Sequence, residues 1–318
     1  MPPATRDKAR RQRGGAEAEV RARRSAEAQQ AAYETSRSVL AAAARRRDAA
    51  WRHAARMSRR RAAIALVAPL AVAIVLMALG FVSRAFLIAG IALACLIAVA
   101  ALTMWVRSPG VLVRRLGGTL VTAERRPAAL RATDAARLVD VAEGLFAVFG
   151  FPSAEIRVLD DPAVNAISVG RSPDRGVVLV TSGLVLLLDR IELEAALAHE
   201  LAHLKRGDTV SGSIAVLGFD PLGRYIPVFA RIADSIAGTE REALADLAAV
   251  GVTRYPPGLI SALEKIAAAP TRKPTSLPRG VAESTSRLWL APFDTVADEP
   301  ERCGALDLSE RIDVLREL

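Results

Sequence analysis

The sequence has few cysteine, histidine and aromatic residues: two Cys, three His and 4% Phe, Trp and Tyr among 318 residues. Cys95 and Cys303 cannot build a disulfide framework, so nothing in the sequence indicates an oxidising compartment. The hydrophobic content of 52% excludes a wholly disordered chain, and the length allows one good-sized domain or two small ones. Two of the three histidines, His199 and His203, lie only four residues apart, and this spacing is the first indication of a functional site.

Positive charge is concentrated at the start of the chain. Residues 1–61 hold 17 basic and 6 acidic residues, whereas the remaining 257 hold 26 and 28. The high isoelectric point therefore belongs to an arm, partly disordered or helical, and does not indicate a globular nucleic-acid-binding domain. Two interpretations stay open: the arm binds anionic lipid or another acidic partner, or it is a solvated extension whose arginines enforce topology. We expect no nucleic acid, since Tyr33 and Trp51 are the arm's only aromatic residues.

Residues 62–106 carry a single charge, Arg84. The run is too long for one membrane helix and fits two, at about 62–82 and 85–106. The alternative, two buried helices of a soluble domain, fits less well because such helices seldom lack a polar face. Arginines gather on both outer flanks, so the positive-inside rule predicts a cell-membrane protein with both termini and the following domain in the cytoplasm.

A connector at residues 107–128 leads into a domain at 129–318 whose pattern predicts an α+β fold, mainly helical with a small β-sheet. We expect a helix over 134–149, short strands at 156–159, 164–169 and 177–180, and a short helix at 184–188. Asp189 and Glu192 form a capping-box pattern that begins a helix running to about Arg206, where Gly207 ends it.

This last helix carries His199-Glu200-Leu201-Ala202-His203, the H-E-x-x-H pattern. The i, i+4 spacing places both imidazoles on one helix face, where they can share a Zn²⁺ ion. Glu200 lies beside them and can take a proton from a water molecule that zinc has acidified to a pKa of about 7. The alternative is two unrelated polar residues on a core helix.

Catalytic zinc usually takes three protein ligands. His53 precedes the membrane segment, so the third ligand is expected to be a carboxylate or Cys303. Glu242 is the best candidate, and Asp246, one helical turn later, can support a ligand histidine by hydrogen bonding. The spacing also permits another interpretation, because Thr239 and Glu242 form a capping-box pattern that needs no metal.

From about Ala129 onward the chain resembles the HtpX-like membrane zinc proteases, relatives of the CAAX prenyl protease. The resemblance rests on stretches in the family's order: Val164-Asn165-Ala166-Ile167, Val180-Thr181-Ser182-Gly183-Leu184, Glu192 through His203 to Gly207-Asp208, Arg241-Glu242 with Ala245-Asp246, and Leu308-Ser309-Glu310-Arg311-Ile312. It implies a zincin-type protease domain behind the two-helix transmembrane hairpin, with one Zn²⁺ per chain held by His199, His203 and Glu242.

The resemblance also implies roles for other residues. Asp208 joins Asp246 as a carboxylate that supports the ligands, and the strand at Asn165-Ala166 is expected to pair with an extended polypeptide substrate. Arg287 stands where the family has a histidine, so it is the candidate for stabilising the oxyanion. The second pair of membrane spans that many relatives carry is not expected here, because residues 209–238 contain Asp220, Pro221 and further polar residues; at most, Val210–Phe219 and Tyr225–Ala237 dip into the interface.

The sequence therefore predicts a membrane-anchored zinc endopeptidase acting on membrane or membrane-proximal polypeptides, with quality control as the role the family suggests. Its partners would be a polypeptide substrate and membrane lipid, while the oligomeric state is left open. Two alternatives remain. The chain is a zinc-binding membrane scaffold with little or no turnover, or it is a non-proteolytic hydrolase using the same zinc site.

Overall fold

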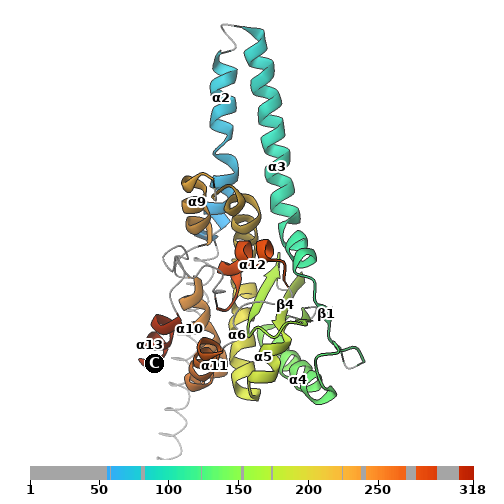
Figure 1. Ribbon diagram of the computed structural model, residues 1–318. Coiled ribbons are helices and arrows are strands. Elements are labelled where there is room, and N and C mark those ends of the chain that lie inside the picture. Colours follow the sequence, from blue (N-terminus) through green and yellow to red (C-terminus); the bar gives the residue numbers. More distant parts are fainter. Residues whose placement is uncertain are drawn as a thin grey trace, which may run out of the picture. The chain divides into compact units, whose positions relative to one another are not determined.

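The computed structural model describes residues 56–57, 59–79, 83–122, 124–151, 154–172, 175–223, 225–237, 241–269, 277–291 and 308–318. Most of the predicted basic arm, together with Thr239 and Cys303, lies outside the described residues. Within them the chain is mostly helical and has one small four-stranded sheet (Figure 1), which confirms the predicted fold class.

The elements follow one another along the chain with short connections. In order they are α2 (Leu70–Ala78), α3 (Arg84–Leu116), β1 (Thr119–Leu120), α4 (Ala132–Phe149), β2 (Glu155–Leu159), β3 (Ala166–Gly170), β4 (Gly176–Thr181), α5 (Ser182–Leu187), α6 (Arg190–Arg206), α7 (Thr209–Ile214), the π-helix η3 (Ala215–Phe219), α8 (Asp220–Gly223), α9 (Pro227–Ala237), α10 (Arg241–Thr253), α11 (Pro256–Ala268), α12 (Arg279–Thr285), the 3₁₀-helix η4 (Ser286–Leu288) and α13 (Leu308–Arg316).

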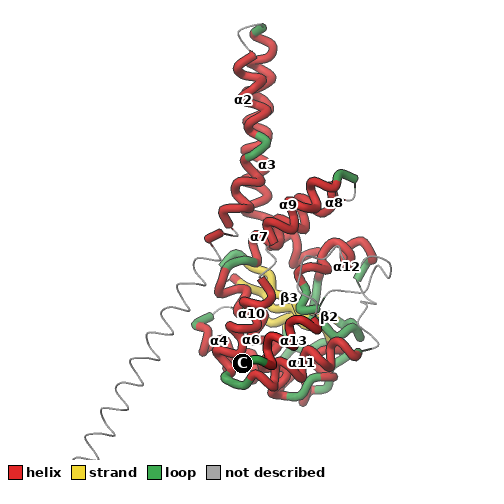
Figure 2. Tube along the Cα trace, turned by 90° about the vertical axis from the view of Figure 1, so that its left-hand side faces the viewer, coloured by secondary structure: helices red, strands yellow, loops and turns green. Residues whose placement is uncertain are grey.

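Two apolar helices run side by side and away from the sheet (Figures 1 and 2). The first covers Arg59–Ala78, with a turn at Pro69 before α2, and the second is α3. Both are long and apolar enough to cross a membrane, and only 11% and 6% of their apolar windows are buried. This low burial argues against the soluble-core alternative. At Gly90 a Cβ atom would lie 2.7 Å from Met77 Cγ, so glycine allows the two helices to touch.

The second apolar helix is longer than the sequence pattern predicts. Instead of ending near Val106, α3 passes through Pro109 and ends at Leu116, inside the expected connector. Proline removes one backbone donor, which usually interrupts a helix. Here the last turns are held by tertiary packing, because Leu112 and Leu116 enter a core cluster with sheet residues such as Ile167. The membrane helix therefore continues directly into the domain.

The sheet has the strand order β1-β2-β4-β3. Strand β2 is parallel to β4, whereas β1 pairs antiparallel with β2 and β3 pairs antiparallel with β4. Ala166 is opposite Val180, and Gly170 is opposite Gly176. This order leaves β3 at an edge of the sheet. The two-residue strand β1 was not predicted, because two residues carry no periodic signal.

Helix α6 is the central helix of the domain and contacts α4, α10, α11 and β3. Its predicted capping box is confirmed: Asp189 Oδ1 accepts from the Glu192 amide, and Glu192 Oε2 accepts from the Asp189 amide at 2.9 Å. Gly207 ends the helix in the left-handed conformation with φ of 68°. A Cβ on Gly176 would lie 2.6 Å from Leu204 Cδ1, so this glycine lets α6 lie close to the β3–β4 hairpin.

The α3 extension gives a stability prediction. Leu112 is fully buried, whereas Leu102 on the same helix is 65% exposed. Leu112→Ala should lower the free energy of unfolding by about 2–5 kcal/mol, because it opens a cavity in the core. Leu102→Ala is the matched control and should change it by less than about 0.5 kcal/mol. Denaturant unfolding of the detergent-solubilised chain, followed by circular dichroism, measures both, and equal losses would contradict this packing.

Candidate metal centre

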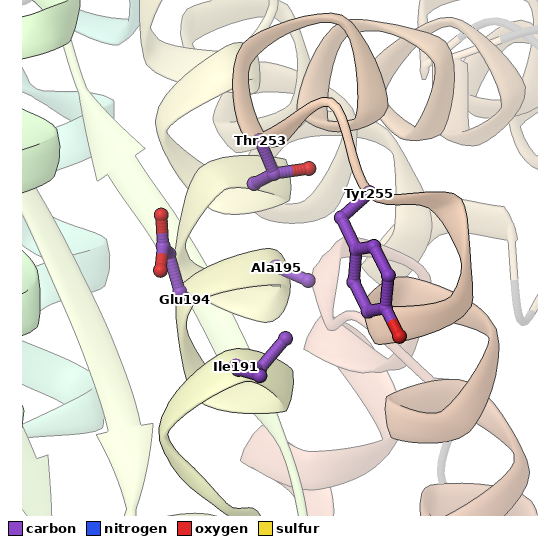
Figure 3. A pocket seen from close by; sticks show the side chains of 5 residues that line it. All are labelled: Ile191, Glu194, Ala195, Thr253 and Tyr255. Atoms are coloured by element: carbon purple, nitrogen blue, oxygen red, sulfur yellow. The ribbon is translucent and has the colours of Figure 1, made fainter.

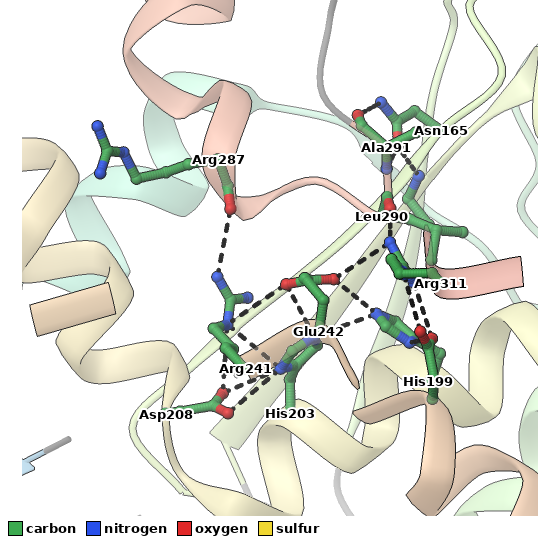
Figure 4. A network of polar contacts seen from close by, with 12 residues as sticks. Asn165, His199, His203, Asp208, Arg241, Glu242, Arg287, Leu290, Ala291 and Arg311 are labelled. Atoms are coloured by element: carbon green, nitrogen blue, oxygen red, sulfur yellow. Dashed lines mark hydrogen bonds and ion pairs between the residues drawn. The ribbon is translucent and has the colours of Figure 1, made fainter. Parts of the chain in front are cut away.

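Three potential ligand atoms converge between α6 and α10. His199 Nε2 lies 3.1 Å from His203 Nε2 and 3.2 Å from Glu242 Oε2. The Nε2 atom of His203 lies 3.5 Å from Glu242 Oε1. All three residues are buried, and their ligand atoms lie within 4.8 Å of one another. The H-E-x-x-H spacing supplies the two imidazoles, and the first turn of α10 supplies the carboxylate (Figure 4).

Each imidazole is oriented by a carboxylate on its other nitrogen. His199 Nδ1 lies 2.7 Å from Asp246 Oδ1, and His203 Nδ1 lies 3.1 Å from Asp208 Oδ1. We assign the proton to Nδ1 in both rings, since each Nδ1 faces a carboxylate. With a metal ion bound, both Nε2 atoms would be unprotonated and would point to the shared centre, which is the arrangement of zinc-binding histidines.

Glu242, Asp246 and Asp208 have lowered pKa values and are ionised at neutral pH. Burial opposes ionisation, but the charge of His203, hydrogen bonds from both histidines and the charge of Arg241 hold the pKa of Glu242 well below its usual range. Burial likewise raises the pKa of Asp246, and Arg311 and His199 more than offset it. For His199, burial lowers the pKa, but Asp246 and Glu242 raise it to about 9, so without a metal ion its Nε2 also carries a proton, which a bound cation would displace. The negative charge here favours binding of a cation.

Two buried arginines complete the network and were given no role in the sequence analysis. Arg311 Nε donates to Asp246 Oδ2 at 2.8 Å, and its Nη1 lies 3.5 Å from Glu242 Oε2. Arg241 Nε lies 3.7 Å from Asp208 Oδ1. It also lies 3.3 Å from His203 Nδ1, but a protonated Nδ1 accepts no hydrogen bond, so we assign Arg241 to Asp208.

A sequence signal for Arg311 did exist. The buried face of α13 consists of Leu308, Arg311, Ile312 and Leu315. Their spacing is that of an apolar helix stripe, so a charged side chain at position 311 requires a buried partner. That partner is Asp246. For Arg241 the corresponding signal is weaker, because an arginine in the first turn of a helix is commonly solvated.

The surroundings of Glu200 indicate whether the site fits a metal ion and a water molecule bound to it. The side chain is 1% exposed, and neither carboxylate oxygen has a hydrogen-bond partner in the described part of the chain. A buried carboxylate without partners is costly, so such a position calls for a donor that the protein itself does not supply. Two imidazoles and one carboxylate are also a common ligand set of catalytic zinc. The residues therefore fit zinc with a water molecule beside Glu200.

Arg287 does not turn toward this centre. Its guanidinium pairs with Asp220 at 2.9 Å and with Asp234, whereas its carbonyl oxygen faces Arg241 (Figure 4). Two carboxylates on α8 and α9 thus hold the side chain that was expected to stabilise an oxyanion. The oxyanion role predicted for Arg287 disagrees with this placement. Sequence reasoning could not foresee it, because both partners come from distant elements.

The strand edge at Asn165-Ala166 is occupied by the chain itself. The Leu290 amide donates to Ala166 O at 2.8 Å. Asn165 Nδ2 donates to Ala291 O at 2.7 Å, and the Ala291 amide donates back to Asn165 Oδ1 (Figure 4). Strand β3 is an edge strand, as the resemblance implies. Asn165 and Ala166, however, already form hydrogen bonds with Leu290 and Ala291. The predicted pairing of substrate with Asn165 and Ala166 therefore disagrees with the contacts observed here.

Residues 132–265 match the model of peptidase family M48. The chain is 40% identical over 162 residues to a protease HtpX homolog of Dictyoglomus thermophilum, covering 41% of this chain and 53% of that relative. Identity to the Tropheryma whipplei homolog is 32% over 192 residues, covering 50% and 64%. For the Limosilactobacillus reuteri homolog it is 27% over 282 residues, covering 76% and 90%.

The chain is therefore HtpX-like, and its residues 132–265 are similar to the M48 peptidases. This confirms the resemblance found in the sequence. The matches to the first two relatives span about half to two thirds of the relatives' length. The M48 segment includes α6 and α10, so it covers the three candidate ligands, whereas Arg287 and Arg311 lie beyond it.

A separate pocket of about 250 Å³ lies at the start of α6 in this HtpX-like chain (Figure 3). Ile191 and Ala195 of α6 lie on the side of Tyr255, and Glu194 and Thr253 complete the lining. None of the candidate ligands lines this pocket, and Glu194 is its only acidic residue. We therefore do not assign it to the metal chemistry.

The hydrogen bond from His199 to Asp246 leads to a prediction about zinc affinity at this site. Asp246→Asn removes the charge that holds His199, so zinc affinity should fall by about 10–100-fold. Asp313→Asn changes a carboxylate that is 71% exposed on α13 and should leave the affinity unchanged. Competition with a chromophoric chelator measures both variants, with circular dichroism as the check on folding. An unchanged affinity in Asp246→Asn would contradict the orienting role.

Proposed function

We propose that this chain is a membrane-anchored zinc-dependent endopeptidase that hydrolyses peptide bonds of membrane or membrane-proximal polypeptides. One Zn²⁺ per chain is held by His199, His203 and Glu242, and Glu200 is the general base. The observation that carries the proposal is the buried Glu200 carboxylate, which follows His199 directly in the chain and has no hydrogen-bond partner among the described residues. A zinc site with a purely structural role has no need of such a base. The M48 match supports the same class.

Zinc in this position would polarise the peptide carbonyl and acidify a water molecule as the nucleophile. Glu200 accepts the proton that this water loses and passes it to the leaving amine nitrogen. Asp246 and Asp208 hold the two imidazoles in the tautomer that leaves Nε2 free. Arg311 balances the charge of Asp246 and Glu242, so that these carboxylates stay buried and ionised.

Contacts between the hairpin helices and the domain would keep the metal centre close to the membrane, where it could reach membrane-proximal polypeptides. Arg59, in the first apolar helix, donates to the Gly207 carbonyl at the end of α6 at 3.3 Å. The last turns of α3 pack in the cluster that holds sheet residues. We place the domain and both termini on the cytoplasmic side, on the grounds of the arginines that flank the hairpin. Quality control of membrane proteins would suit this location.

A zinc-binding scaffold without turnover is the second candidate. The specific observations in its favour are the Arg287 side chain turned away from the centre and the Ala166 edge occupied by Leu290. Both features would lower the efficiency of peptide hydrolysis, because they remove a donor and a substrate-pairing position. Glu200, whose carboxylate has no hydrogen-bond partner in the part of the chain that the structure describes, argues for the protease.

The proposal predicts that Glu200→Gln abolishes hydrolysis without loss of zinc. Cleavage of an unstructured protein such as casein by the full chain in detergent should fall by about 10²–10⁴-fold, because the general base is gone. The isosteric amide leaves all three ligands in place, so zinc should stay near one per chain by elemental analysis.

Glu143→Gln is the matched control, since Glu143 is an exposed residue of α4. It should cleave casein at the wild-type rate. Equal cleavage by the wild type and Glu200→Gln would contradict the role of Glu200. Zinc in every variant with cleavage in none would favour the scaffold.

A further inference from the structure

The turn between α8 and α9 exposes a group of apolar side chains. We call this group the α8–α9 tip; it consists of Leu222, Tyr225, Ile226 and Val228, which are 45%, 85%, 47% and 53% exposed. Contiguous exposed apolar residues rarely occur on a soluble surface without a partner. None of the hydrogen bonds and ion pairs described above for the three candidate ligands involves a residue of the α8–α9 tip.

The opposite face of α9 fixes the position of the tip. Ala233 and Ile236, with Phe229 and Ile232 beside them, pack in one cluster with residues at the foot of the hairpin, namely Ala62, Ala65, Leu66, Met104 and Trp105. The neighbours of these foot residues, such as Ile64 and Leu102, are 68% and 65% exposed and belong to the membrane-crossing surface. The α8–α9 tip therefore lies next to the domain end of the hairpin, where the exposed apolar surface of the two helices stops (Figure 2).

Several arginines lie at this domain end of the hairpin. Arg61 donates to the Ser235 carbonyl of α9 at 3.3 Å, and Arg60, Arg107 and Arg231 are exposed nearby in the chain. A pocket of about 260 Å³ beside the tip has Arg115 and Tyr225 in its lining. Apolar side chains next to arginines match the boundary between acyl chains and lipid phosphates.

We propose that the α8–α9 tip docks on the bilayer surface and forms a third membrane attachment in addition to the two helices of the hairpin. Helix α8 has 4 residues and α9 has 11. Both are too short to cross a bilayer, which takes about 20 residues, so they lie along its surface. The occupant is lipid, because α9 packs on the foot of the hairpin, next to residues such as Ile64 and Leu102 that expose apolar surface on the membrane-crossing helices.

This attachment also sets the depth of the metal centre. Asp220 of α8 and Asp234 of α9 hold the guanidinium of Arg287. The Arg287 carbonyl accepts from Arg241, at 3.4 Å, and Arg241 lies beside Asp208 and Glu242. A continuous path of polar contacts thus runs from the membrane surface to the ligands.

Site-directed spin labelling of the full chain in liposomes tests the proposal. The label is placed by Tyr225→Cys in a background with Cys95→Ala and Cys303→Ala. Leu96→Cys, 66% exposed on α3, is the lipid reference, and Val148→Cys, 66% exposed on α4, is the water reference. Collision rates with oxygen, which concentrates in lipid, and with a water-soluble nickel chelate are measured at each site.

The label at Tyr225 should show an oxygen-to-nickel collision ratio several-fold above that at Val148 and closer to that at Leu96. A ratio equal to that at Val148 would show the tip in water and overturn the proposal. Low collision rates with both reagents would show the tip covered by protein, such as a second copy of the chain, and would also overturn it. Neither result bears on peptide hydrolysis, so this test and the Glu200 test fail independently.

Discussion

The hydrogen bond between His199 and Asp246 is the interaction on which the site depends most. It joins α6 to α10, fixes the tautomer of the first imidazole and, through the pairing of Asp246 with Arg311, also joins α13 to the site. Four buried carboxylates and three buried guanidiniums surround the two histidines, namely Glu200, Asp208, Glu242, Asp246, Arg206, Arg241 and Arg311. Buried charges persist only when they are paired or bind metal. The four carboxylates outnumber the three guanidiniums by one, and either a proton on His199 or a bound cation balances the remaining charge.

The membrane helices and the domain that carries the site are joined by direct packing contacts and a hydrogen bond. Arg59 contacts the carbonyl that ends α6, while α3 passes Pro109 and packs its last turns against the sheet. No flexible connector separates hairpin and domain between Arg84 and Leu116. Because helix α6 carries both histidines, its distance from the bilayer is set by packing.

Local features of the sequence were predictive, and features that depend on distant partners were not. Asp189, Glu192 and Gly207 define α6 through nearest-neighbour hydrogen bonds, so its bounds could be read directly. The i, i+4 histidines also needed only helix geometry. The Arg287 side chain, in contrast, was drawn away by Asp220 and Asp234, and the Ala166 edge was occupied by Leu290. The residues concerned lie 53 to 124 positions apart in the chain, so no local pattern encodes either contact.

Zinc K-edge X-ray absorption on the purified full-length chain tests the central claim most directly. The account predicts two imidazole nitrogens and oxygen ligands, all at about 2.0–2.2 Å, with no sulfur. The oxygens would come from Glu242 and one water molecule. A sulfur contribution at about 2.3 Å would bring Cys303 into the ligand set and contradict the site described here. Zinc without imidazole scattering would refute it altogether.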